Sequence, residues 1–279
     1  MERNKQPVRV STVLIYVFFC FMMVLYLAPL GWIAMTSVKD RSEIYKSPFG
    51  WPSEFHWENY KAAWTGGKLG IAMLNSLFVC VITLLLTIII GSMAAFAIAR
   101  LKWKLSGAAM VYILIGMMIP VHCVLIPLFV RFAKIGLNNN LWGLIIPYLT
   151  FSLPTCVFIM SGFFRSIPNE LLESACMDGC TIYQIFFRIC FPLARTGLFV
   201  TGLMTFIGNW NELLLALVFV SDANKKTLPV ALTKFVTPYQ TNYDKMFPAI
   251  MIAIIPTIIV YCLFSNQIVD GLTTGAVKG

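Results

Sequence analysis

The chain alternates long apolar runs with shorter polar segments along its 279 residues. A helix needs about 20 predominantly apolar residues to cross the hydrocarbon core of a bilayer. The apolar runs reach that length, and charged side chains gather between them, so the pattern predicts an all-α fold, a polytopic membrane helix bundle of about six transmembrane helices. The predicted spans are residues 12–35, 71–99, 106–130, 141–163, 195–220 and 247–267.

The connections between the spans differ in character. Residues 36–70 and 221–246 are long, polar and aromatic, whereas residues 164–194 mix polar and apolar positions. A glycine-rich tail follows the last span. No internal repeat or low-complexity segment marks a boundary, so residues 1–279 are predicted to form one membrane domain.

Proline recurs inside the predicted spans. It removes a backbone donor and tends to kink a helix, and a membrane tolerates this where neighbouring helices or a cavity satisfy the freed groups. The helices are therefore expected to pack around one another, with some of them lining a path. The positions are Pro29, Pro120, Pro127, Pro147, Pro154 and Pro256.

Composition agrees with a lipid environment. Of the residues, 59% are hydrophobic and 12% charged, and the mean hydropathy is +0.80, whereas soluble domains carry about 25% charged residues. The net charge of +9 comes from basic residues that flank apolar runs, as is usual in membrane proteins. Nucleic-acid binding is therefore not expected.

Charge alone leaves the orientation open. With a cytoplasmic N-terminus, ten basic residues would lie inside and eleven outside, so the positive-inside rule does not decide. Arg3, Lys5 and Arg9 precede the first run, but that run is too long for a signal peptide and no small-residue cleavage site follows. A retained first helix is expected.

Few residues in the chain suit catalysis or metal binding. The only histidines are His56 and His122, too few for a credible Ser/His/Asp arrangement, and no histidine lies near Cys176, Cys180 and Cys190. We therefore expect no catalytic and no metal-ligating residues, and interpret the eight cysteines as packing residues. The chain also lacks a GxxxxGK[ST] phosphate-binding loop, so it is not expected to hydrolyse ATP.

Segment 164–194 is too short and too polar to cross a bilayer, and its pattern predicts a helix-turn-helix at one membrane face. Ser166 is suited to cap the first helix and Pro168 to its first turn. Gly179 allows a sharp turn before a second helix. The apolar patch of the first helix fits either a protein partner or lipid headgroups, and the residues alone do not choose between them. The patch consists of Leu171, Leu172, Ala175 and Cys176.

The same segment carries a spaced motif. Glu173-Ser174-Ala175 is followed after three residues by Gly179, and after nine more by Ile189 and Pro192. This order resembles the EAA signature of ABC importer permeases, which reads Glu-Ala-Ala, three residues, Gly, nine residues, Ile-x-Leu-Pro. Ser174 and Phe191 replace the usual alanine and leucine.

The resemblance covers most of the chain. The tail Gly271–Gly279 is similar to that of the maltose-type carbohydrate permeases, which narrows the match to sugar importers. Other similar stretches are Asn75-Ser76-Leu77, Met118-Ile119-Pro120, Ile126-Pro127-Leu128, Trp210-Asn211-Glu212 and Thr227-Leu228-Pro229-Val230.

The resemblance implies a function and an assembly. In that family the loop is cytoplasmic and contains a coupling helix that docks in a cleft of the ATPase subunit. It implies a permease subunit of an ATP-driven, binding-protein-dependent sugar importer, in a bacterial or archaeal cytoplasmic membrane with both termini in the cytoplasm. The coupling residues implied are Glu173, Ser174, Ala175, Asp178, Gly179, Ile189 and Pro192.

The resemblance also implies partners. They are a second permease subunit, normally a different chain, two ABC ATPase subunits that hold ATP and Mg, and an extracytoplasmic sugar-binding protein. This chain itself is expected to bind no cofactor. Segments 36–70 and 221–246 are the expected docking surfaces for the binding protein.

Polar residues within the spans are candidates for the substrate pathway. Glu212 is the one acidic residue well inside an apolar run, and a carboxylate facing lipid costs about 2.5–3.5 kcal/mol on insertion scales. It should therefore face the bundle interior, a partner or water, with Trp210 offering an aromatic face to a sugar. A structural hydrogen-bond cluster is the alternative. The candidates are Asn75, His122, Asn209, Trp210, Asn211 and Glu212.

Three other functions stay open at this stage. An ABC permease for a non-sugar solute fits the signature but not the tail. An ion-coupled secondary transporter needs no loop at 164–194 and predicts more buried charge. A non-transporting scaffold leaves both Glu212 and the EAA spacing unexplained.

Overall fold

The computed structural model describes residues 10–236 and 241–276, with side chains described as far as residue 264. It divides into two compact units. One comprises the chain up to Gly67 with Lys234–Ile252, and the other comprises Lys68–Thr233 with the chain from Ala253. Arg3, Lys5, Arg9 and the tail residues 277–279, Lys278 among them, lie outside the described residues.

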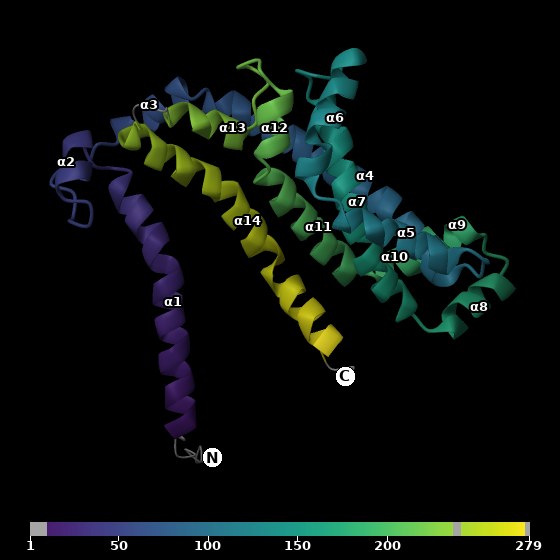
Figure 1. Ribbon diagram of the computed structural model, residues 1–279. Coiled ribbons are helices and arrows are strands. Elements are labelled where there is room, and N and C mark those ends of the chain that lie inside the picture. The colour runs from purple at the N-terminus through teal and green to yellow at the C-terminus, as the bar shows by residue number, and fades with distance from the viewer. Residues whose placement is uncertain (1–9, 237–240, 277–279) are drawn as a thin grey trace. The chain divides into compact units, whose positions relative to one another are not determined.

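The described residues are helical apart from turns and a single β-bridge between Val236 and Thr241, so the predicted all-α class is confirmed (Figure 1). The helices are α1 Val10–Thr36, α2 Arg41–Lys46, α3 Glu58–Gly66, α4 Leu69–Arg100, α5 Ser106–Met118, α6 Val121–Lys134, α7 Trp142–Arg165, α8 Asn169–Met177, α9 Ile182–Ile185, α10 Phe191–Leu193, α11 Arg195–Trp210, α12 Leu214–Phe219, α13 Leu228–Leu232 and α14 Tyr243–Ala276.

Four stretches of these helices are long and apolar enough to cross a membrane: Ser11–Thr36, Leu69–Arg100, Trp142–Arg165 and Tyr243–Phe264. Two bent pairs raise the number to six if each pair forms one span. The pairs are α5 with α6, bent by 91°, and Ile182–Leu193 with α11, bent by 77°. The predicted number of about six transmembrane spans thus equals the upper end of this range of four to six.

The predicted span over 106–130 contains a sharp break. The chain leaves the helical conformation at Ile119, with φ −78° and ψ 111°, and α6 restarts after Pro120. A residue before proline is disfavoured in the α region because the ring clashes with its backbone. Helices of 13 and 14 residues are each about 20 Å long, too short to span the hydrocarbon core alone.

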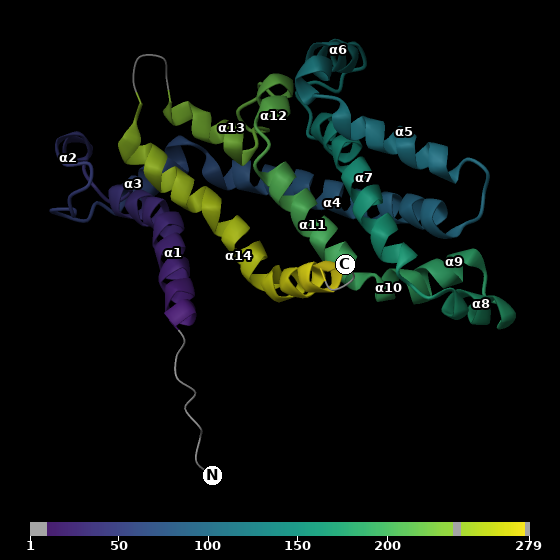
Figure 2. The same ribbon diagram turned by 60° about the horizontal axis from the view of Figure 1, so that its bottom comes forward.

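Within the second unit, α4 packs against α7, which crosses it at an angle (Figure 2). The two backbones approach closely at Gly91, where an added Cβ would collide with the Cys156 thiol. Small residues at such crossings are typical of membrane helices, which associate through close packing rather than through the hydrophobic effect. Thr83, Thr87 and Ser92 are also buried on α4. The α4–α7 pair is the framework on which the rest of this unit packs.

In the first unit, the segment after α1 folds around Lys39. Its side chain is 0% exposed, and its ammonium donates to the carbonyl oxygen of Ser47 over 2.9 Å. The Trp32 indole N–H donates to the carbonyl of Pro48, also over 2.9 Å. Asp40 caps α2 by accepting from the amide of Ser42. A buried charge needs such partners, so these contacts hold the polar segment in one fold.

Candidate functional site

The loop at 164–194 begins with α8, and its start differs from the prediction. Pro168, rather than Ser166, occupies the N-cap position, and it makes no side-chain cap. The Ser166 hydroxyl instead donates to the carbonyl of Phe163 at the end of α7, over 2.8 Å. Proline preorganises the entry to a helix through its fixed φ, so α8 starts without a capping side chain.

Gly179 ends α8 as predicted. Its φ is +77°, a left-handed conformation that glycine adopts without steric cost. The Gly179 amide donates to the carbonyl of Cys176 and the Cys180 amide to that of Ala175, both over 3.0 Å, which is the Schellman pattern. Thr181 then caps α9 in a capping box with Gln184. The turn between the two helices is therefore fully specified by local hydrogen bonds.

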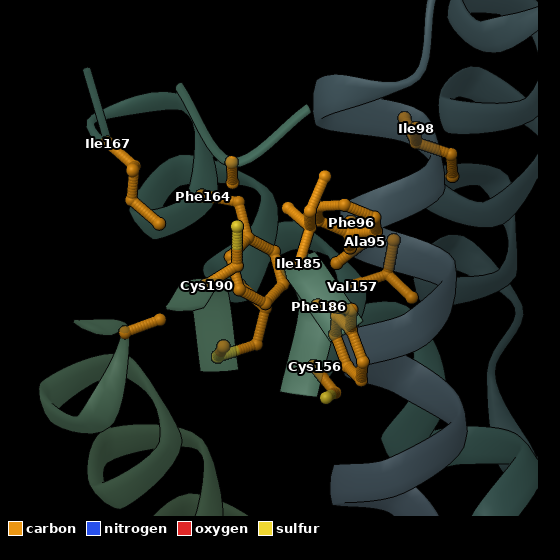
Figure 3. Packing of buried hydrophobic residues seen from close by; sticks show 13 residues of the cluster. Ala95, Phe96, Ile98, Cys156, Val157, Phe164, Ile167, Ile185, Phe186 and Cys190 are labelled. Atoms are coloured by element: carbon orange, nitrogen blue, oxygen red, sulfur yellow. The ribbon is translucent and has the colours of Figure 1, made fainter. Parts of the chain in front are cut away.

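One face of the loop is buried against its own chain. Ile185 of α9 packs with Phe96 of α4 and Phe164 of α7 (Figure 3). Ala175 of α8 belongs to the same cluster, and Leu172 is half-buried against it. Phe186 joins both rings, at centroid distances of 5.3 and 6.1 Å from Phe96 and Phe164. The apolar patch, predicted to face either a protein partner or lipid headgroups, is thus partly used internally, because Ala175 and Leu172 pack against the chain's own cluster.

The other face of α8 is exposed. Glu173, Ser174 and Asp178 all lie on it, and Met177 is 88% exposed. Leu171, which belongs to the predicted patch, is also exposed. An exposed apolar surface rimmed by polar side chains is typical of an interaction site. Of the remaining predicted coupling residues, Ala175 is buried, Ile189 is half-buried and Pro192 is exposed.

A charged hydrogen bond also joins this loop to α4. Arg100, the last residue of α4, donates from Nη2 to the carbonyl oxygen of Ile167 over 2.7 Å. Ile167 is buried and directly precedes the N-cap of α8. The charged hydrogen bond therefore fixes the entry to α8 relative to the end of a long span.

The predicted span 195–220 is also interrupted. Helix α11 ends at Trp210 and α12 begins at Leu214. Glu212 lies in the break, where its carboxylate accepts from the amides of Leu215 at 2.7 Å and Ala216 at 3.2 Å. It also accepts from the Tyr148 hydroxyl of α7 over 2.5 Å. A carboxylate at a helix start is stabilised by those amides and by the helix dipole, so Glu212 is held in the break by hydrogen bonds within the chain.

A cavity of about 420 Å³ adjoins this break. Of the predicted pathway residues, Asn209 and Glu212 line it. Asn209 is half-buried, and within the described residues its Nδ2 has no hydrogen-bond partner. The rest of the lining consists of Val121, Tyr148, Phe151, Ser152, Thr155, Met204, Thr205, Gly208 and Leu215. Tyr148 and the hydroxyls of Ser152, Thr155 and Thr205 were not predicted from the sequence, since hydroxyl residues in apolar runs carry no distinctive signal.

The other predicted pathway residues lie elsewhere. Trp210 is 3% exposed, stacks on Phe206 and donates to the carbonyl of Ala253, so its ring does not offer a face to the cavity. Asn211 is exposed and donates to the carbonyl of Ile207. His122 is exposed near the start of α6.

Asn75 has a structural role in the described fold. Its amide donates to the carbonyls of Asn224 and Lys226, at 2.9 and 3.0 Å. The next residue, Ser76, accepts from the Leu228 amide over 2.7 Å. Two stretches singled out in the sequence, at 75–77 and 227–230, are therefore in contact, and they close the end of α4 opposite Arg100.

Comparison with known proteins assigns the family. Residues 87–275 match the family described as "Binding-protein-dependent transport system inner membrane component", and this match spans α4 from its middle to α14. The chain belongs to this family of binding-protein-dependent transport permeases. It is therefore a multi-pass membrane protein and a transport subunit, rather than an enzyme.

Characterised relatives extend over nearly the whole chain. The diacetylchitobiose uptake system permease protein NgcG of Streptomyces coelicolor is 34% identical, over 91% of this chain and 85% of its own. The trehalose transport system permease protein SugB of Mycobacterium tuberculosis is 36% identical, and the match covers 91% of this chain and 93% of SugB. A crystal structure of a bacterial ABC transporter that imports alginate has the same fold, with a TM-score of 0.80, 22% identity and coverage of 95% and 99%.

Proposed function

We propose that this chain is the permease subunit of an ATP-driven, binding-protein-dependent sugar importer, in which it forms half of the translocation pathway. The observation that carries the proposal is the geometry of the 164–194 loop. One face is packed on α4 and α7, and the other presents Glu173, Ser174 and Met177 outward. A surface held this firmly can follow a docked ATPase and move the membrane helices with it.

The energy source would lie in other chains. Two ABC ATPase subunits would bind ATP and Mg and hydrolyse the ATP, since the sequence has no phosphate-binding loop of its own. ATP drives alternating access only if it binds the inward-facing and outward-facing states unequally. The exposed face of α8 includes Leu171 and Asp178. Through this face, the unequal binding of ATP to the two states would act on this subunit.

A sugar is the solute that the cavity suits. The Glu212 carboxylate and Tyr148 hydroxyl bind each other, which leaves the Asn209 amide and the hydroxyls of Ser152 and Thr155 as available polar groups in the lining. Such neutral donors and acceptors match sugar hydroxyls. The relatives named for diacetylchitobiose and trehalose transport support the same class of substrate.

The assembly and orientation complete the proposal. A second permease, normally a different chain, would form the other half of the pathway. The loop at 164–194 and both termini would be cytoplasmic, in a bacterial or archaeal cytoplasmic membrane. An extracytoplasmic sugar-binding protein would dock on 36–70 and 221–246, where exposed aromatic side chains include Trp51 and Trp57.

The coupling role is tested by Glu173→Ala. We expect loss of ATP-dependent sugar uptake, with the chain still inserted and assembled, because the substitution removes a carboxylate from the docking face. Glu170→Ala is the matched control, since Glu170 is an exposed residue of the same helix outside the signature. Uptake at the parental rate in Glu173→Ala would contradict the coupling role. Uptake that persists without any ATPase would favour an ion-coupled transporter instead.

The pathway role is tested by a pair of asparagines two positions apart. Asn209 lines the cavity, whereas Asn211 is exposed and bonded to its own helix. We expect Asn209→Ala to change the KM or kcat of uptake for a panel of disaccharides and short oligosaccharides, and Asn211→Ala to change neither. Equal kinetics in both variants would remove the cavity from the pathway while leaving the coupling role intact.

A further inference from the structure

The turn that follows α4 forms an open cavity that the transport function does not use. Its volume is about 570 Å³, and it lies between residues 98–106 and the start of α8. The lining consists of Ile98, Ala99, Arg100, Leu101, Lys102, Trp103, Lys104, Ser106 and Asn169. It contains three basic side chains and no carboxylate.

The two lysines of this cavity are available to a ligand. Within the described part of the chain, neither Lys102 nor Lys104 has a hydrogen-bond or ionic partner, and both are exposed. Arg100 uses Nη2 to bind the carbonyl of Ile167, while its Nε is buried and lacks an acceptor among the described residues. The local charge is therefore positive and unneutralised, which favours an anion.

Neutral donors and two helix starts complete the lining. Ser106 is the first residue of α5 and Asn169 the first residue of α8, and neither helix has a side-chain cap. The first turn of a helix carries unsatisfied amides and a partial positive charge. A phosphate group between these two starts and the lysines would meet both hydrogen-bond donors and favourable charge.

The cavity also adjoins the end of a helix that is long and apolar enough to cross a membrane. It begins where α4, a membrane-spanning helix, ends at Arg100. The Trp103 ring is 41% exposed, and its N–H donates to the carbonyl of Ala97, over 3.0 Å, in the last turn of α4. Tryptophan and lysine together at the end of a span are typical of the headgroup region.

We infer that this cavity binds the headgroup of an anionic phospholipid. The Lys102 and Lys104 ammonium groups and the Asn169 amide would contact the phosphodiester, while the Trp103 ring would pack against the upper acyl chain. A lipid is favoured over free phosphate because half of the lining is apolar and the cavity adjoins the bilayer. The site is new relative to the transport role, since no residue of the cavity belongs to the coupling or pathway sets.

Quenching of tryptophan fluorescence tests the lipid site directly. The full-length protein is placed in phosphatidylcholine vesicles that contain brominated phosphatidylglycerol or brominated phosphatidylcholine, and the Trp103→Phe variant isolates the Trp103 signal from the other tryptophans. We expect stronger quenching of Trp103 by the anionic lipid. Each of Lys102→Gln and Lys104→Gln should lower that preference by up to about fivefold.

The control is a double variant that removes two charges elsewhere. Arg131→Gln/Lys134→Gln acts at the end of α6, on residues that are exposed and outside the cavity, and it should leave the preference unchanged. Equal quenching by both lipids, or a preference that survives Lys102→Gln/Lys104→Gln, would overturn the site. Inorganic phosphate, added at matched ionic strength, distinguishes a lipid headgroup from free phosphate as the ligand. If it abolishes the difference between the lipids, the site takes free phosphate and the lipid assignment is wrong.

Discussion

The Tyr148 hydroxyl donates to Oε2 of Glu212 over 2.5 Å, joining α7 to the break between α11 and α12. The same carboxylate accepts from two amides at the start of α12. Glu212 therefore organises the break as well as lining the cavity. Its hydrogen bonds to these backbone amides explain why an acidic residue lies within an apolar run.

Tyr148→Phe leaves that carboxylate without one of its partners. We expect the free energy of unfolding in mixed micelles to fall by about 1–3 kcal/mol, because a half-buried charged acceptor loses a donor. Glu212→Ala should cost more, since it also removes the carboxylate that accepts from the amides of Leu215 and Ala216 in α12. A double-mutant cycle checks the pair: the costs of the single variants should fail to add, and simple additivity would show that the two side chains act independently.

Gly179→Ala strains the turn after α8. Its φ of +77° is unfavourable for a residue with Cβ, although no atom lies within 4 Å of that position. We expect a loss of about 1 kcal/mol in stability and a lower rate of ATP-dependent uptake. Gly162→Ala in α7 is the control, because its surroundings are equally open and its φ is not positive. Identical uptake in the two variants would mean that the turn tolerates a side chain.

Gly91→Ala tests the close approach of α4 and α7. The added methyl group would meet the Cys156 thiol and, at 3.0 Å, its Cβ. Overpacking of this kind typically costs about 1–3 kcal/mol, and Cys156→Ala should recover part of it. Gly202→Ala is a matched substitution with ordinary contact, since the nearest atom, Leu84 Cδ1, lies at 3.6 Å. Chemical denaturation of all three variants provides the measurement.

His56 and Glu58 provide a pH-dependent contact in the polar segment after α1. Their Nδ1 and Oε1 atoms are 2.7 Å apart, and this hydrogen bond raises the pKa of His56 above its ordinary value of 6.5. The contact thus stabilises the fold fully below pH 6.5 and is lost as pH rises through the raised pKa. NMR titration should show the His56 pKa falling in Glu58→Gln, with His122→Asn used to assign the two histidine signals. An unchanged His56 pKa would exclude the pairing.

Much of the loop at 164–194 was predictable because its signals are local. The left-handed turn follows from Gly179, and the capping box of Thr181 and Gln184 uses residues three positions apart. The position of Ser166 misled the capping prediction, since proline can start α8 without a side-chain cap. Local signals do not state which face of the helix the rest of the chain covers, and so the packing of Ala175 was not foreseen.

The cavity was only partly predictable, for a different physical reason. Glu212 stands out in an apolar run, but its partner Tyr148 lies 64 residues away, and nothing in the sequence pairs them. Asn75 looked like a pathway residue because a polar group within a span is expensive. In the structure that need is met by carbonyls of residues 224 and 226, about 150 residues further along. Long-range pairing of this kind determines which polar residues remain free.

Helix α4 has the properties of a lever. Its 32 residues make a rod about 48 Å long. Ser76 near one end holds the Leu228 amide, and Arg100 at the other holds the carbonyl before α8. A tilt of about 5° in a rod of this length moves its tip by about 4 Å. A small rotation of α4 about its end at one membrane surface would therefore move its other end. That displacement would exceed the length of the hydrogen bonds that anchor the helix.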